Sequence, residues 1–137
     1  MKTFYEWVDI EIAVSNLCKK LKDESFEAIY GITRDGLIIA VMMSHKLDIP
    51  LITSLTNMFD KKFLVVDDIA DTGKTLEKWK NLEVCNNAKF ATIDFHEQSV
   101  VEPDYWINEK GDKWIVYPWE REDSDEIQDY YKGVVVV

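Results

Sequence analysis

The feature that most constrains the fold is a run of apolar residues that ends in three acids and a glycine-containing turn. It reads FLVVDDIADTGKT and spans positions 63–75. A continuous apolar run rich in β-branched residues is typical of a strand buried on both faces of a parallel sheet. The stretch therefore predicts such a strand over 62–68, followed by a turn and a helix over 72–84.

Helical and strand patterns alternate along the rest of the chain. Apolar residues recur every three or four positions in one further segment, at Trp7, Ile10, Val14, Leu17 and Leu21. Residues 36–47 also read as a helix, and the helix over 72–84 is expected to bury Leu76, Trp79 and Leu82. The other predicted strands are 26–33, 50–55 and 90–95. This alternation favours an α/β fold with a mainly parallel central sheet flanked by helices.

After Asp104 the sequence becomes aromatic, and Gly111 indicates a turn. This change predicts a small C-terminal hood above the sheet. We expect one domain over 1–137, with a core of about 1–97 and a hood of about 98–137. The acidic stretch 120–126 is expected to be solvated, and the final GVVVV to be an edge strand or a partner contact.

Charge and hydropathy exclude several classes of protein. The formal net charge is −10, whereas nucleic-acid and membrane-surface binders need a basic face. No apolar run is long enough for a membrane span. Cys18 and Cys85 are not closely spaced and have no histidine partners, so a metal site or a disulfide is not indicated. We expect a protein of the reducing cytoplasm that binds neither nucleic acid nor membrane.

The three acids at the end of the predicted strand call for a ligand. Carboxylates placed together at a buried strand end repel one another and are costly to desolvate. A cation, or ligand hydroxyls that donate hydrogen bonds, would offset this cost. A simple N-cap by Asp71 or Thr72 is the alternative, but it leaves Asp67 and Asp68 unexplained. A P-loop is disfavoured by spacing, because Asp68 stands where its first glycine is required.

The stretch VVDDIADTGKT resembles the phosphoribosyl-pyrophosphate (PRPP) motif of type I phosphoribosyltransferases. The resemblance implies that Asp67 and Asp68 hold the ribose hydroxyls, directly or through Mg²⁺. It also implies that Asp71 accepts or relays the N7 proton of a purine. The predicted 5′-phosphate site is made by the donors of Asp71, Thr72, Gly73, Lys74 and Thr75.

A second turn, TRDG at 33–36, resembles the pyrophosphate-binding loop of the same family. The residues expected to contact pyrophosphate are Thr33, Arg34, Asp35 and Gly36. An ordinary strand-to-helix turn with a surface arginine is the alternative. Asp35 departs from the family pattern, because purine members commonly have glycine there. A carboxylate beside pyrophosphate is repulsive unless a metal intervenes or the side chain turns away.

The C-terminal part is similar to the bacterial xanthine-guanine branch of that family, and the resemblance implies a purine site. His96 stands where the branch has a lysine that recognises a 6-oxo group, which puts 6-oxopurine preference in doubt. Trp114 and Ile115 match its Trp-Ile pair, and the Pro-Trp-acid segment ends at Glu120. The predicted base contacts are His96, Trp114 and Ile115, and the predicted metal ligands are Asp67, Asp68 and Glu120. As alternatives, His96 is a surface residue and the tryptophan is a core anchor.

Together these resemblances imply a Mg²⁺-dependent enzyme that transfers phosphoribose from PRPP to a purine base. The family usually has a long mobile loop before the PRPP strand, whereas here only residues 56–61 are available. A regulatory protein that binds PRPP or a nucleotide without efficient transfer is therefore the second hypothesis. The resemblance also implies a homodimer or higher homo-oligomer.

Overall fold

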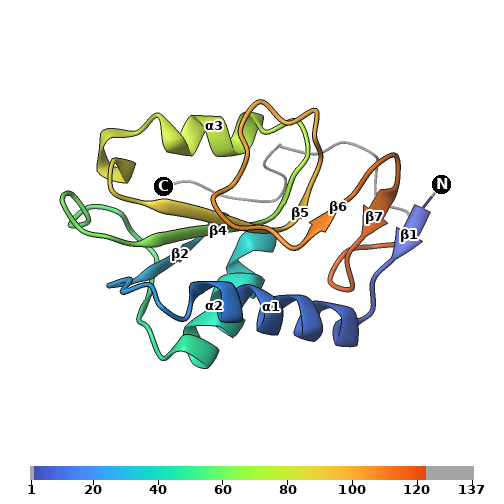
Figure 1. The fold of residues 1–137 in the computed structure, drawn as a ribbon, viewed down its shortest axis with the longest axis horizontal. Helices are drawn as coiled ribbons and strands as arrows, with labels where there is room; N and C mark the ends of the chain where they lie inside the picture. The colour runs from blue at the N-terminus through green and yellow to red at the C-terminus, as the bar shows by residue number, and fades with distance from the viewer. Residues whose placement is uncertain (1, 123–137) are drawn as a thin grey trace.

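The computed structural model describes residues 2–122 and confirms the predicted α/β architecture (Figure 1). A five-stranded sheet, with every pairing parallel, has the order β3-β2-β4-β5-β6. Its strands are β2 (Ile29–Gly31), β3 (Leu51–Ile52), β4 (Leu64–Ala70), β5 (Lys89–Phe95) and β6 (Asn108–Glu109). The helices are α1 (Trp7–Leu21), α2 (Asp35–Leu47), α3 (Lys74–Lys80) and the short 3₁₀ helix η1 (Glu83–Cys85). The GVVVV segment and most of 120–126 lie outside the described residues.

Helices cover both faces of the sheet, with α1 and α2 on one side and α3 on the other (Figure 1). Alternate side chains of β4 point to opposite faces of the sheet and pack into two different core clusters. Leu64 and Val66 join the core cluster that contains α1 and α2, whereas Val65 joins the cluster that contains Leu76 of α3. Every residue of β4 is buried, as the continuous apolar run predicted.

Two predicted core positions are wrong. Trp7 is 54% exposed because it lies in the first turn of α1, where its ring packs beside Trp119 rather than under the sheet. Leu82 is exposed because α3 ends at Lys80, before the helical period can bring residue 82 back to the sheet. The predicted strands at 26–33 and 50–55 exist, but each is shorter than its apolar pattern suggested.

The N-terminus and the hood form a second, two-stranded sheet that the sequence pattern did not predict. In it, β1 (Lys2–Phe4) pairs in parallel with β7 (Trp114–Val116). Two hydrogen bonds tie this unit to the main sheet: Tyr5 and Tyr117 donate their hydroxyls to the Asp94 carboxylate at 2.7 and 2.6 Å, and the second of these bonds is buried. Among residues 2–122, no helix is both long and apolar enough to cross a membrane.

The buried Asp94 carboxyl should make the free energy of unfolding decrease as pH rises from about 4 to about 6. Burial raises the pKa of this carboxyl from 3.8 to about 6, although the two tyrosine hydroxyls act in the opposite direction. The folded state therefore holds the proton over a range in which the unfolded chain has already lost it, which contributes about 3 kcal/mol of pH dependence. In Asp94→Asn this part of the decline should disappear in urea unfolding measured at pH 4, 5 and 6.

The exposed change Asp112→Asn removes the same chemical group and serves as the control. A decline in Asp94→Asn as steep as that of the wild type and of Asp112→Asn would show that the buried carboxyl is not the source.

Candidate active site

The acidic residues of the 63–75 stretch are buried at the carboxyl end of the central strand. Asp67 and Asp68 lie within β4, and Asp71 follows it; each is less than 10% exposed. The Asp68 backbone N–H donates to Asp67 Oδ1 at 2.8 Å. Gly36, at the start of α2, lies directly against this strand, so the turn after β2 lies next to the carboxyl end of β4.

A cluster of three carboxylates forms where α2, β4 and the hood meet. One oxygen each of Asp35, Asp68 and Glu120 lies within 4.8 Å of the others. Asp68 Oδ2 is buried and has no hydrogen-bond partner among the described residues. The cluster thus contains two of the three predicted metal ligands, and it includes Asp35 rather than Asp67.

The electrostatics of this cluster favour a bound cation or protonation. Burial, together with the charges of Asp67 and Asp35, raises the pKa of Asp68 well above its usual range. Burial and the neighbouring Asp35 raise the pKa of Glu120 to about 7, although a backbone hydrogen bond and the charge of Arg34 oppose this rise. Oxygen ligands grouped in this way match the preference of Mg²⁺.

The predicted pyrophosphate loop is open to solvent. Thr33 and Arg34 are exposed, and the peptide bond between them is cis. The positive charge of Arg34 acts to lower the pKa of Glu120, which belongs to the carboxylate cluster. The loop therefore presents one cation and one hydroxyl next to a site suited to a metal.

The turn at 71–75 is shaped by the segment that follows β5. Gly73 has a φ of +82°, and a Cβ there would overlap the Ser99 hydroxyl, so only glycine fits without strain. The Val100 N–H donates to the Thr72 carbonyl at 2.9 Å. Lys74 is exposed, and Thr72 and Thr75 are partly exposed. Donors of this turn are therefore accessible to an anion such as a phosphate.

Asp71 accepts hydrogen bonds at both carboxylate oxygens. Gln98 Nε2 donates to Oδ1 at 3.1 Å, and Lys110 Nζ donates to Oδ2 at 3.2 Å. The side chains of Asp71 and Lys110 are only 9% and 8% exposed. The Lys110 ammonium also lies over the Trp114 ring, 5.2 Å from its centroid. A buried cation thus connects the predicted proton acceptor with the predicted base-stacking residue.

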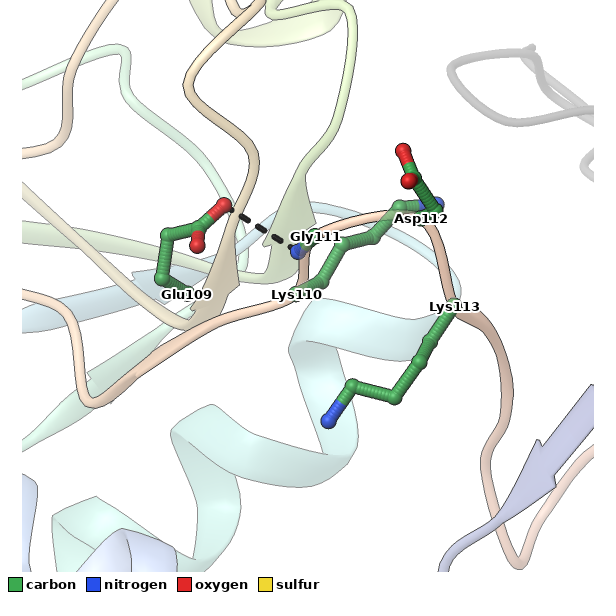
Figure 2. Close-up of a pocket in the computed structure, with 5 residues that line it drawn as sticks. All are labelled: Glu109, Lys110, Gly111, Asp112 and Lys113. Carbon is green, nitrogen blue, oxygen red and sulfur yellow. Dashed lines mark hydrogen bonds between the residues drawn. The ribbon is translucent and has the colours of Figure 1, made fainter.

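Lys110 also borders a cavity of about 510 Å³ at the turn between β6 and β7. The lining residues are Glu109, Lys110, Gly111, Asp112 and Lys113 (Figure 2). The Gly111 N–H donates to Glu109 Oε1 and closes the turn. The side chains of Lys110 and Lys113 leave the turn in different directions (Figure 2). Only Lys110 of this group has a described contact with Asp71.

The other predicted base contacts differ in their surroundings. Trp114 and Ile115 are buried in β7, so the tryptophan is also a core residue. His96 is partly exposed. Its backbone N–H donates to the Ala70 carbonyl, and its ring Nδ1 accepts a hydrogen bond from the Gln98 backbone N–H. His96 thus lies in the turn next to Asp71, but no contact between the two side chains is described.

Two members of the site were not identified from the sequence, Lys110 and Gln98. Neither lies in a motif, and 39 positions separate Lys110 from Asp71 in the chain. The connection between β3 and β4 spans residues 53–63. Met58 is buried and anchors this connection to the core.

Comparisons with known proteins agree with this geometry. The chain is 31% identical over 122 residues to a xanthine-guanine phosphoribosyltransferase of Desulfotalea psychrophila, covering 74% of this chain and 75% of the relative. A crystal structure of a purine phosphoribosyltransferase from Pyrococcus horikoshii superposes with a TM-score of 0.81 at 34% identity, covering 93% of this chain and 99% of that one. A Helicobacter pylori xanthine-guanine-hypoxanthine phosphoribosyltransferase gives 0.73 at 19% identity, covering 88% and 94% of the two chains. No protein-family model matches the chain.

Proposed function

Because the chain belongs to the type I phosphoribosyltransferases, in the bacterial xanthine-guanine branch, we propose that its substrates are PRPP and a 6-oxopurine base. The products are then a nucleoside 5′-monophosphate and pyrophosphate. The observation that carries this assignment is the set of buried carboxylates at the end of β4, in a turn with phosphate-binding donors. The names of the relatives support the choice of a 6-oxopurine, and the buried cation at Asp71 agrees with it.

Asp71 is the residue that we assign to proton transfer. A base nitrogen attacks the anomeric carbon of PRPP, the bond from that carbon to pyrophosphate oxygen breaks, and pyrophosphate leaves with the electron pair. The proton on N7 of the base passes to the Asp71 carboxylate. This carboxylate still accepts the hydrogen bonds from Gln98 and Lys110, because each of its oxygens has more than one lone pair. The protein otherwise contributes mainly by positioning the reactants and stabilising the departing charge.

The binding groups divide into three sets. For the ribose hydroxyls we propose Asp67 and Asp68. For the 5′-phosphate we propose the donors of 71–75, and for pyrophosphate those of 33–36, where Arg34 supplies the positive charge. For the base we retain His96, Trp114 and Ile115 as the predicted contacts.

The carboxylate cluster fits Mg²⁺. Its oxygens are close together, and the unpartnered Asp68 Oδ2 is a buried acceptor that a cation would satisfy. We propose Asp35, Asp68 and Glu120 as the residues that hold the ion. Bound there, Mg²⁺ would neutralise negative charge on the pyrophosphate group. This also accounts for Asp35, whose carboxylate would otherwise repel that group.

The proposal also covers the compartment of the protein and its oligomeric state. The free, buried Cys18 and Cys85 fit a reducing compartment such as the cytoplasm. Exposed apolar residues on β1 and α1 provide a surface for a homo-oligomer: Phe4, Trp7, Val8 and Ile12.

Release of pyrophosphate from PRPP and hypoxanthine tests the proposed site. We expect release with Mg²⁺, none after EDTA treatment, and recovery when Mg²⁺ is added in excess. Asp68→Asn should raise the Mg²⁺ concentration needed for half-maximal rate by about tenfold or more, because one of the carboxylates proposed to hold the ion is lost.

An exposed change of the same type, Asp60→Asn, is the control and should leave the Mg²⁺ requirement as it is in the wild type. An Asp68→Asn protein with an unchanged requirement would remove this residue from the metal site.

A further inference from the structure

Tyr117 is a buried residue of the hood that connects the carboxylate cluster to two strands of the main sheet. Its side chain is 1% exposed, and its ring stacks on the Trp119 ring with the centroids 5.1 Å apart. Its hydroxyl donates to Asp94 Oδ2 on β5 at 2.6 Å, and the hydroxyl oxygen lies 3.4 Å from the Asp68 carbonyl oxygen on β4. The far end of the ring is therefore fixed at the strands that form the site.

The backbone of Tyr117 contacts another member of the carboxylate cluster, Glu120. The Tyr117 N–H donates to Glu120 Oε1 at 2.9 Å, and the Tyr117 carbonyl accepts the Glu120 N–H at 2.9 Å. The two bonds close a turn over 117–120 and orient the glutamate side chain, whose carboxylate lies with those of Asp35 and Asp68. A carboxylate has about four lone-pair sites, so this hydrogen bond leaves room for a cation.

We infer that Tyr117 is a positioning residue of the metal site, which sets the place of the Glu120 carboxylate relative to Asp68. This inference rests on the proposed Mg²⁺ site. The hydroxyl anchors Tyr117 at the strand that contains Asp68, and the backbone N–H passes this position on to Glu120. Removing a group that holds a metal ligand in place typically weakens metal binding by about 10- to 100-fold.

The rival assignment is a purely structural role, in which the Tyr117 ring only fills the core between the hood and the sheet. Tyr5 offers a comparison that separates the two roles. Its hydroxyl donates to the other Asp94 oxygen at 2.7 Å, and its ring meets the Tyr117 ring edge-on at a centroid distance of 5.5 Å. Among residues 2–122, none of the hydrogen bonds described for Tyr5 reaches a member of the carboxylate cluster.

The test is Mn²⁺ binding to the full chain without substrates, measured from the free-ion signal in electron paramagnetic resonance. Mn²⁺ prefers the same oxygen ligands as Mg²⁺. Tyr117→Phe keeps the ring and the backbone N–H and removes only the hydroxyl, and it should raise the dissociation constant for Mn²⁺ about tenfold. Tyr5→Phe removes the other hydroxyl from the same carboxylate and should bind Mn²⁺ as the wild type does. A structural role would make the two variants alike.

Pyrophosphate release gives a second readout. In Tyr117→Phe the Mg²⁺ concentration at half-maximal rate should rise about tenfold, because Glu120 is less well placed. The kcat at saturating Mg²⁺ should stay within about twofold of the wild-type value, because every proposed ligand is still present. If Tyr117→Phe folds poorly, both titrations are repeated in sucrose, which favours the compact state.

Asp68→Asn separates the role of Tyr117 from the metal site itself. A wild-type protein that does not bind Mn²⁺, or whose binding is unchanged in Asp68→Asn, overturns the proposed site and the role of Tyr117 with it. Binding that is weakened in Asp68→Asn but not in Tyr117→Phe overturns the role of Tyr117 alone. Equal weakening in Tyr117→Phe and Tyr5→Phe assigns Tyr117 a structural role instead.

Discussion

Asp71→Asn should lower kcat/KM for purine transfer by about 10²- to 10⁴-fold, the usual contribution of a positioned acid–base group. The amide keeps the shape of the side chain but cannot take up the base proton. Affinity for PRPP alone should change much less, because the 5′-phosphate and pyrophosphate donors remain. Steady-state kinetics with hypoxanthine, together with a direct PRPP binding titration, would measure both quantities.

The same substitution also affects stability, and this has to be separated from catalysis. Asp71→Asn leaves the buried Lys110 ammonium without its counter-charge, which typically costs about 3–5 kcal/mol. In Asp71→Asn/Lys110→Met both charges are absent, so much of the lost unfolding free energy should return. We expect the activity not to return. A double variant that is stable and nearly as active as wild type would show that Asp71 does not handle the proton.

Gly36→Ala should cost about 3 kcal/mol of unfolding free energy and most of the transferase activity. A Cβ on Gly36 would overlap the Val66 carbonyl oxygen and lie 2.9 Å from the Asp67 Cα. Both are backbone atoms of the central strand, so no side-chain rotation can relieve the clash. Either β4 or the 33–36 loop must move, and the two binding loops would lose their alignment. Urea unfolding and pyrophosphate release would report the two effects.

Gly111→Ala is the appropriate comparison. Apart from Gly111 and its two chain neighbours, no atom of residues 2–122 lies within 4 Å of the added Cβ, although the φ of +59° disfavours alanine by about 1 kcal/mol. The prediction would be contradicted if Gly36→Ala were no less stable than Gly111→Ala and retained full activity.

The central strand and the positions of its acids could be predicted because they follow from local pattern. Residues 64–70 are buried on both faces, and the turn after β2 lies next to the carboxyl end of β4, as parallel strands require. Helix ends were predicted less well. At α3 the apolar spacing continues to Leu82, but the helix ends at Lys80 and leaves this leucine exposed.

The partners of the acids could not be predicted, because they come from distant parts of the chain. Nothing in the sequence around Lys110 indicates that its ammonium reaches Asp71, and only the path of the hood brings them together. The same holds for Asp94, whose two tyrosine partners lie 89 and 23 positions away. From the sequence alone, the Asp35 carboxylate is expected to repel pyrophosphate. The fold places it with Asp68 and Glu120, where it would be a ligand of a bound metal ion.

The most direct test of the account is to identify the product by mass spectrometry after incubation of the protein with PRPP, Mg²⁺ and guanine, hypoxanthine, xanthine or adenine. We predict a nucleoside 5′-monophosphate with at least one 6-oxopurine, pyrophosphate in equal amount, and little or no product with adenine. Binding of PRPP without a nucleotide product from any of the four bases would contradict the account and indicate a regulatory binding protein.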